Sequence, residues 1–114
     1  MIISMGKNIF VDIDDTICET DGMNYSESNP IMKNITFVNK LFEEGHRITY
    51  WTARGTKTGT DHRKLTEEQL KIWGAKYHEL RLQKPAYDIL IDDKAINNIS
   101  EARLLCNIFS DIVN

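Results

Sequence analysis

Three carboxylates stand directly behind a short apolar run near the start of the chain, and they limit what this chain can fold into. Asp12, Asp14 and Asp15 follow the run Ile9-Phe10-Val11. The run predicts a buried strand, and acids at the end of such a strand are costly to hold together unless a cation or a reaction uses them. Because they are two residues apart, Asp12 and Asp14 point to the same side while the strand lasts.

Length and composition indicate one globular domain, residues 1–114. Of the 114 residues, 41% are hydrophobic and 27% are charged, which suits a single core. The net charge of −3 gives no general attraction for nucleic acid or anionic membranes, so we expect neither as a partner. Because no segment has the pattern of a signal peptide or a membrane span, we expect a cytoplasmic protein. Cys18 and Cys106 show no metal or disulfide spacing and are expected to be reduced.

Short apolar runs alternate with amphipathic segments along the chain. The runs predict strands at residues 9–13, 48–52, 80–82 and 88–91. With the helices between and after them, the order is β-α-β-α-β-β-α. Strands connected by helices form a parallel sheet between helix layers, and ligands gather at the carboxyl ends of the strands. The sequence therefore predicts an α/β fold with a site at one edge of the sheet.

Capping signals place the helices. Residues 29–30, Asn-Pro, predict the N-cap and first residue of a helix that Gly45 ends. Residues 66–69, Thr-Glu-Glu-Gln, have the pattern of a capping box and predict the start of a second helix that stops near Gly74. Apolar residues spaced along 102–112 predict a closing helix.

Polar residues fall at the predicted strand ends. The strands deliver, in order, Asp12 and Asp14; Thr52 with Arg54; Lys84; and Asp92 and Asp93. Carboxylates in this setting suit Mg²⁺, which prefers oxygen ligands, and a lysine and a hydroxyl suit the oxygens of a phosphate group. With phosphate held in this way, one carboxylate can attack phosphorus while a second moves the proton.

These residues resemble the four ordered motifs of the haloacid dehalogenase (HAD) superfamily of phosphatases. The motifs are Asp12-Ile13-Asp14-Asp15-Thr16 after a hydrophobic strand, then Thr52, then Lys84, then Ile89-Leu90-Ile91-Asp92-Asp93. The resemblance spans residues 9–94 and implies a three-layer Rossmann-like fold. It also implies a capless protein, because neither position at which the family inserts a cap domain has room for one.

The resemblance implies a role for each matched residue. Asp12 would be the nucleophile that forms an aspartyl-phosphate, and Asp14 would be the general acid and base. Thr52 and Lys84 would bind and orient the phosphate. The cofactor would be Mg²⁺, held by Asp12, Asp14 through its backbone carbonyl, Asp92 and Asp93.

Two further segments bear on the substrate. Residues 51–54 and 91–96 are similar to small HAD proteins encoded with capsular polysaccharide genes, which implies a sugar phosphate or a related small phosphate ester. An open site implies either a macromolecular substrate or closure by a loop or by a second copy of the chain. Residues 53–64 are the candidate loop, with four basic and one acidic residue for a net +3. Arg54 is expected to contact substrate, since its planar fork suits phosphate or carboxylate.

Two alternatives stay open beside a phosphatase. A receiver-type signalling module also has a phosphorylated aspartate and an acidic Mg²⁺ site, but it presents its acidic pair before the other motifs. A catalytically silent HAD scaffold would keep the fold without turnover. Asp15 and Thr16 are expected to be structural, stabilising the turn after the strand.

Overall fold

A three-stranded parallel sheet organises residues 6–102 and 104, which are the residues that this computed structural model describes. β1 (Asn8–Asp12), β4 (Arg47–Trp51) and β5 (Glu79–Arg81) lie in the order β1-β4-β5. Asp12 pairs with Trp51, and Trp51 pairs with Arg81, so the three strands end level with one another. The strands expected at 9–13, 48–52 and 80–82 are thereby confirmed to within one residue.

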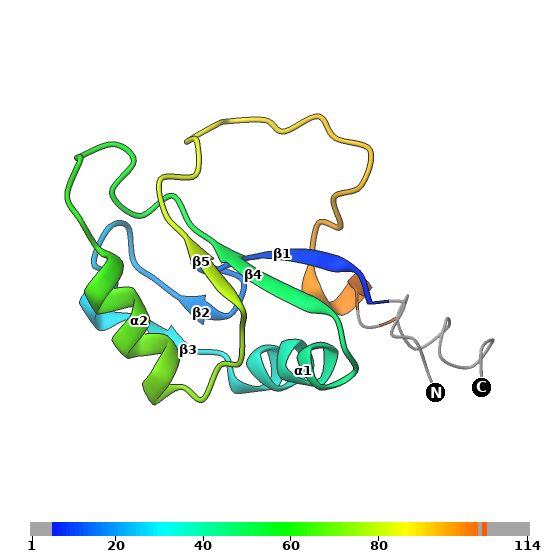
Figure 1. Cartoon of the computed structure of the whole chain (residues 1–114). Coiled ribbons are helices and arrows are strands. Elements are labelled where there is room, and N and C mark those ends of the chain that lie inside the picture. The colour runs from blue at the N-terminus through cyan, green and yellow to red at the C-terminus, as the bar shows by residue number, and fades with distance from the viewer. Residues whose placement is uncertain (1–5, 103, 105–114) are drawn as a thin grey trace.

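Two helices cover one face of this sheet (Figure 1). α1 (Met32–Glu43) connects β1 to β4, and α2 (Arg63–Ile72) connects β4 to β5. Glycines with positive φ follow both helices, Gly45 at 98° and Gly74 at 71°, where a side chain would be strained. The predicted ends of both helices are therefore confirmed.

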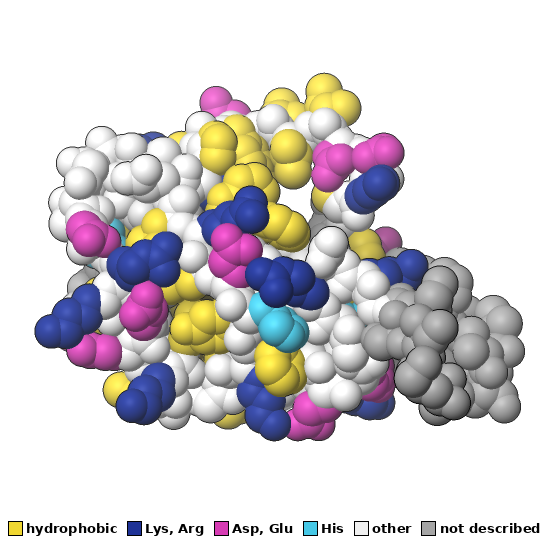
Figure 2. All heavy atoms as spheres, viewed as in Figure 1, with side chains coloured by type: hydrophobic (Ala, Val, Ile, Leu, Met, Phe, Trp, Pro, Cys, Tyr) yellow, Lys and Arg dark blue, Asp and Glu magenta, His cyan; other side chains and the backbone are white. Residues whose placement is uncertain are grey.

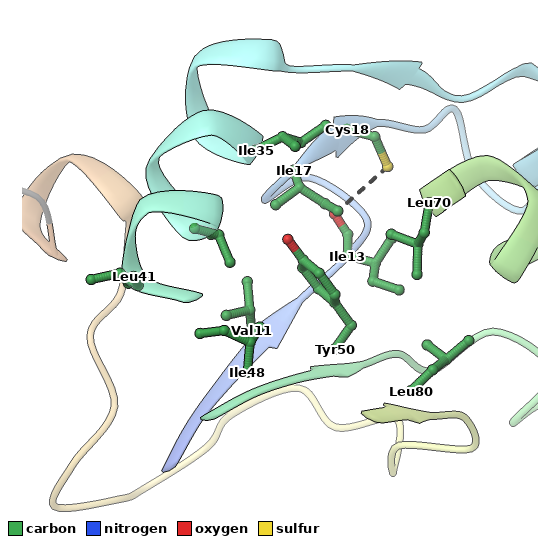
Figure 3. Close-up of a cluster of buried hydrophobic side chains, with 11 residues drawn as sticks. Val11, Ile13, Ile17, Cys18, Ile35, Leu41, Ile48, Tyr50, Leu70 and Leu80 are labelled. Atoms are coloured by element: carbon green, nitrogen blue, oxygen red, sulfur yellow. Dashed lines mark hydrogen bonds between the residues drawn. The ribbon is translucent and has the colours of Figure 1, made fainter. Parts of the chain in front are cut away.

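A single hydrophobic core lies between the helices and the sheet (Figure 3). Tyr50 of β4 lies in its middle with no exposed surface, and its hydroxyl has no hydrogen-bond partner among the described residues. The other fully buried or nearly buried apolar members are Val11, Ile13, Ile17, Cys18, Ile35, Val38, Leu41, Ile48, Leu70 and Leu80. The partly buried Ile99, at the start of the helix at residues 99–102, packs against this same core. The described helices therefore form one layer on one face of the sheet, whereas the expected three-layer fold would have helices on both faces.

The helix starts differ from the sequence prediction. Asn29–Pro30 is a short strand, β3, that pairs with β2 (Cys18–Glu19) in an antiparallel hairpin enclosing the 3-10 turn η1 (Tyr25–Glu27). α1 therefore begins at Met32. α2 begins at Arg63, so the predicted capping box at residues 66–69 lies inside the helix and cannot cap it.

The segment after β5 departs most from expectation. Residues 88–91 form no strand; they belong to a stretch that arches away from the sheet before residues 99–102 turn into a helix (Figure 1). Ile89 is 79% exposed and Ile91 is 94% exposed. Figure 2 shows hydrophobic side chains on the surface of this stretch. The predicted strand at 88–91 is wrong for this structure, and most of the closing helix predicted at 102–112 lies outside the described residues.

Among the described residues, no helix combines the length and the apolar character that crossing a membrane would require.

Candidate active site

A cleft of about 620 Å³ opens at the carboxyl end of β1. Asp12, the last residue of β1, lies in it. The remaining lining comes from three segments: Met23 and Tyr25 of the hairpin; Ala53, Gly55, Lys57, Thr58, Thr60 and His62 after β4; and Lys84, Pro85, Ala86 and Tyr87 after β5. This volume suits a metabolite-sized ligand.

Asp12 and Lys84 face each other inside the cleft. The Lys84 Nζ lies 3.7 Å from Asp12 Oδ1, and the Thr16 hydroxyl donates to Asp12 Oδ2 at 3.3 Å. The Asp12 side chain is 40% exposed, which leaves it accessible to a ligand. Burial raises the pKa of Asp12 above its usual 3.8, and the attraction of Lys84 offsets that rise only in part. A carboxylate that has lost part of its hydration and an ammonium thus meet where a phosphate could enter.

Backbone contacts between two loops place Lys84. Its amide donates to the Thr52 carbonyl at 2.9 Å, and its carbonyl accepts a hydrogen bond from the Thr56 hydroxyl at 2.7 Å. Gln83, immediately before it, has a φ of 60°, which turns the chain at that point. The ammonium lies 5.3 Å from the Trp51 ring centre and is only 16% exposed. Lys84 is therefore fixed in direction by β4 and the loop that follows it.

Asp14 is held by several donors. Arg54 donates from Nη2 to Asp14 Oδ1 at 2.9 Å and from Nε to Oδ2 at 3.1 Å. The Thr20 hydroxyl donates to Oδ1 at 2.6 Å and the Thr52 hydroxyl to Oδ2 at 3.4 Å. Burial alone would raise the pKa of Asp14, but the hydrogen bonds from Arg54 and Thr20 and the charge of Arg54 outweigh it and lower the pKa. Asp14 is thus an ionised carboxylate with both oxygens occupied.

Arg54 lies beneath the cleft rather than in it. The residue is 1% exposed, and it is absent from the residues that line the 620 Å³ cleft. Its Nη1 donates to Thr66 Oγ1 at 3.1 Å and to Gln69 Oε1 at 2.6 Å, and its guanidinium lies 4.8 Å from the Tyr25 ring centre. Arg54 is among the residues around a second cavity, of about 420 Å³, but its side chain has no exposed surface, so the expected contact between its guanidinium and a ligand in the 620 Å³ cleft is not made in this arrangement.

The partners of Arg54 on α2 leave a signal in the sequence, but that signal has two interpretations. Thr66 and Gln69 are three residues apart on α2, which places them on one helix face. The same spacing matches a capping box, which is what the sequence predicts. In the structure, both side chains turn inward to Arg54 and are buried.

Thr52 is also committed to the protein. It is buried, its hydroxyl accepts a hydrogen bond from the Arg54 amide at 3.1 Å, and it donates to Asp14. The structure brings Thr52 close to Asp14 and Lys84, as expected for one sheet edge. The hydroxyl itself points to Asp14 and does not line the cleft.

Asp92 and Asp93 lie elsewhere. Both are exposed, and the Asp92 carboxylate accepts from the amides of Asp93 at 2.7 Å and Lys94 at 3.4 Å, as in a local turn. Within the described residues, no group of three or more His, Cys, Asp or Glu is placed to hold a metal ion. The predicted Mg²⁺ set of Asp12, Asp14, Asp92 and Asp93 is therefore not assembled, because the strand that should have delivered Asp92 is not formed.

The predicted loop at 53–64 supplies one wall of the cleft. Gly55 is buried with a φ of 82°, and a Cβ at this position would stand 2.2 Å from the Thr60 carbonyl oxygen. Farther along, the His62 ring packs edge-on against Tyr25, with ring centres 5.0 Å apart. The hairpin and this loop thus meet over Arg54. Met23, Tyr25 and Tyr87 are lining residues that the sequence does not predict, since they lie outside the segments with a periodic apolar pattern.

Comparisons with known proteins support the fold and leave function open. No protein-family model matches the chain, and no curated protein matches it. The crystal structure of an MCSG target protein from Vibrio cholerae is similar, with a TM-score of 0.76 over 94% of this chain and 98% of that one. The two sequences are 23% identical, so the likeness concerns the α/β fold alone.

Proposed function

We propose that this protein is a phosphoric monoester hydrolase that works through an aspartyl-phosphate on Asp12. The observation that carries the proposal is the pairing of Asp12 with Lys84 at 3.7 Å inside an open cleft at the end of a parallel strand. The order of the sequence motifs, which resembles that of HAD phosphatases, supports it. Ligand binding at the carboxyl ends of parallel strands is also the general rule for such sheets.

The chemistry assigns a task to each group. An Asp12 carboxylate oxygen attacks phosphorus, the bond from phosphorus to the ester oxygen breaks, and the departing alkoxide takes up a proton from solvent. Water then attacks the aspartyl-phosphate, loses its proton to a base, and releases inorganic phosphate and free Asp12. Lys84 offsets the negative charge on the phosphoryl oxygens in both steps. Asp14 does not itself line the cleft, but its carboxylate is ionised, and we propose that it accepts the proton of the attacking water and passes it to solvent.

The rest of the cleft suits a small polyhydroxylated leaving group. Thr58, Thr60 and His62 offer hydrogen-bonding groups along one wall, while Tyr25 and Tyr87 offer aromatic surface. We propose a sugar phosphate or a related small phosphate ester, of the kind used in capsular or surface polysaccharide biosynthesis. A second copy of the chain could cover the open mouth of the cleft.

The proposal includes Mg²⁺ as the cofactor on the condition that Asp92 moves close to Asp12. Asp12 and the backbone carbonyl of Asp14 are oxygen ligands of the type that Mg²⁺ prefers. Asp92 would join them only if the segment around residues 88–93 moved to the end of β1. The described arrangement does not fit a complete site, so no step of the proposed mechanism runs through the metal.

A panel of phosphorylated sugars and small phosphate esters, assayed with Mg²⁺ present, tests the proposal. We expect the wild-type protein to release phosphate from at least one ester and Asp12→Asn to fall to the level of buffer. Asp15→Asn is the matched control, because Asp15 is exposed, has a φ of 64° that asparagine tolerates, and lies outside the cleft. Equal activity in the wild type and Asp12→Asn would refute the nucleophile. A silent scaffold would hydrolyse none of the panel.

A further inference from the structure

Arg54 is a buried cation with an unusual number of partners. Its side chain has no exposed surface, although the carboxylate that it binds is 23% exposed. Taking a guanidinium out of water is expensive unless its donors are satisfied, and breaking such a pair is costly as well. The five nitrogen-bound hydrogens of Arg54 are directed to Asp14, Thr66, Gln69 and Ser28.

These partners come from three different parts of the fold. Thr66 and Gln69 belong to α2, Ser28 to the hairpin between β1 and α1, and Asp14 to the turn after β1. Gln69 extends the network, because its Nε2 donates to the Tyr25 carbonyl at 2.6 Å. The network therefore joins the hairpin, which forms one wall of the cleft, and α2, which lies outside the cleft, to the proposed proton-transfer carboxylate.

We infer that Arg54 is a positioning residue that acts through Asp14: it fixes the direction of the Asp14 carboxylate and couples that direction to the hairpin wall of the cleft and to α2. The inference rests on the proposed function, and it replaces the expectation that Arg54 touches substrate. A fork that donates to both oxygens of one carboxylate fixes its plane as well as its distance. Lysine cannot reproduce this geometry, since it is a point charge.

A kinetic double-mutant cycle separates this role from direct substrate binding. Arg54→Met leaves Asp14 without its fork, and a misplaced catalytic group costs on the order of a hundredfold in kcat. Because Arg54 does not line the cleft, we expect KM to change little. In the Asp14→Asn background, Arg54→Met should lower kcat no further than about twofold, since the group that it positions is already lost.

Additive effects would overturn the inference. Asp14→Asn alone should lower kcat by about a hundredfold, the usual worth of a general acid or base. If Arg54 acted independently of Asp14, the two losses would multiply to about ten-thousandfold, and a rise in KM would return Arg54 to substrate binding. Lys84→Met is the contrast variant, expected to raise KM because Lys84 lies in the cleft. Arg63→Met is the matched arginine control. Arg63 is exposed, pairs with Glu67 at 3.2 Å, donates to the Leu80 carbonyl at 2.9 Å, and lies outside the residues that line the 620 Å³ cleft, so kcat should stay at the wild-type value.

Milder variants guard against loss of folding. Thr66→Val keeps the volume of the side chain but removes the hydroxyl that accepts from Arg54 Nη1. Arg54→Lys keeps the charge. We expect both to lower kcat at unchanged KM, and both effects to disappear in the Asp14→Asn background.

A double-mutant cycle on thermal unfolding tests, without any substrate, whether Arg54 clamps the Asp14 carboxylate in place. The shifts in unfolding midpoint of Arg54→Met and Asp14→Asn should be strongly non-additive, whereas those of Arg63→Met and Glu67→Gln, an exposed pair, should nearly add. An inactive wild-type protein would refute the proposed phosphatase but leave this cycle readable. Additive shifts for Arg54 and Asp14 would refute the clamp even in an active enzyme.

Discussion

Asp12 and Asp14 are two residues apart in the chain, yet their surroundings push their pKa values in opposite directions. Burial raises the pKa of Asp12, and the Lys84 ammonium, 3.7 Å away in the cleft, offsets that rise only in part. The pKa of Asp14 is lowered because Arg54 and Thr20 donate to the carboxylate and together outweigh its burial. The lowered pKa keeps Asp14 ionised, so that it can accept a proton, while the raised pKa of Asp12 sets the pH above which the nucleophile is available.

The raised pKa of Asp12 predicts the acid limb of the pH profile. Asp12 must be ionised to attack phosphorus, so kcat/KM should fall as the pH drops through its pKa. Because that pKa is raised, the fall should occur at a pH above the ordinary aspartate value of 3.8. A second ester whose phosphate has a different pKa separates this limb from ionisation of the substrate. A limb at or below the ordinary value would show that burial does not govern the ionisation of Asp12.

Tyr50 offers a prediction about stability. Its hydroxyl is buried in the core without a partner among the described residues, and burial raises its pKa because the charged form is not solvated there. An unsatisfied buried polar group costs free energy, so Tyr50→Phe should raise the free energy of unfolding by about 1 kcal/mol. Denaturant unfolding measures it. A loss of stability would show that the hydroxyl has a partner.

At the scale of elements, the sequence predicted what depends on periodicity and glycine. β1, β4, β5 and the ends of both helices follow from apolar runs and from Gly45 and Gly74. Their parallel pairing brings Asp12, Asp14, Thr52 and Lys84 to one edge, as expected. What a helix face buries is harder to predict, because the three-residue spacing of Thr66 and Gln69 fits a cap as well as a contact to Arg54.

The turn after β4 can be tested at Gly55. A Cβ there would stand 2.2 Å from the Thr60 carbonyl oxygen, and the φ of 82° is strained for any side chain. Gly55→Ala should cost about 1–2 kcal/mol of stability from the backbone and more from the clash, and it should lower activity by moving the cleft wall. Gly59→Ala is the matched control, with a φ of 73° but nothing within 4 Å of the added atom. Equal losses in the two variants would exclude the clash.

At the scale of the whole molecule, the open question is the segment after β5. The apolar run at residues 88–91 predicts a strand. Such a strand would bury Ile89 and Ile91, which expose most of their surface in the described arrangement. β1 is an edge of the described sheet, with no partner on its outer side among the described strands. A strand's position depends on contacts with distant parts of the chain, which an apolar run does not specify.

Hydrogen exchange with and without Mg²⁺ tests whether this segment completes the site. If the proposed magnesium site forms with Asp92, the segment must pair with the free edge of β1, and the amides of residues 88–91 should become protected when Mg²⁺ is added. Asp92→Asn should remove that protection. Activation by Mg²⁺ with no change in exchange would show that Asp92 is not a ligand.

The central claim is that Asp12 carries the phosphoryl group, and trapping the phosphorylated protein tests it most directly. The protein would be mixed with an accepted phosphate ester, quenched in acid during turnover, digested and analysed by mass spectrometry. We expect one added phosphoryl group on Asp12 in the wild type and none in Asp12→Asn. Turnover with Asp12 unmodified, or the phosphoryl group on another residue, would contradict the claim.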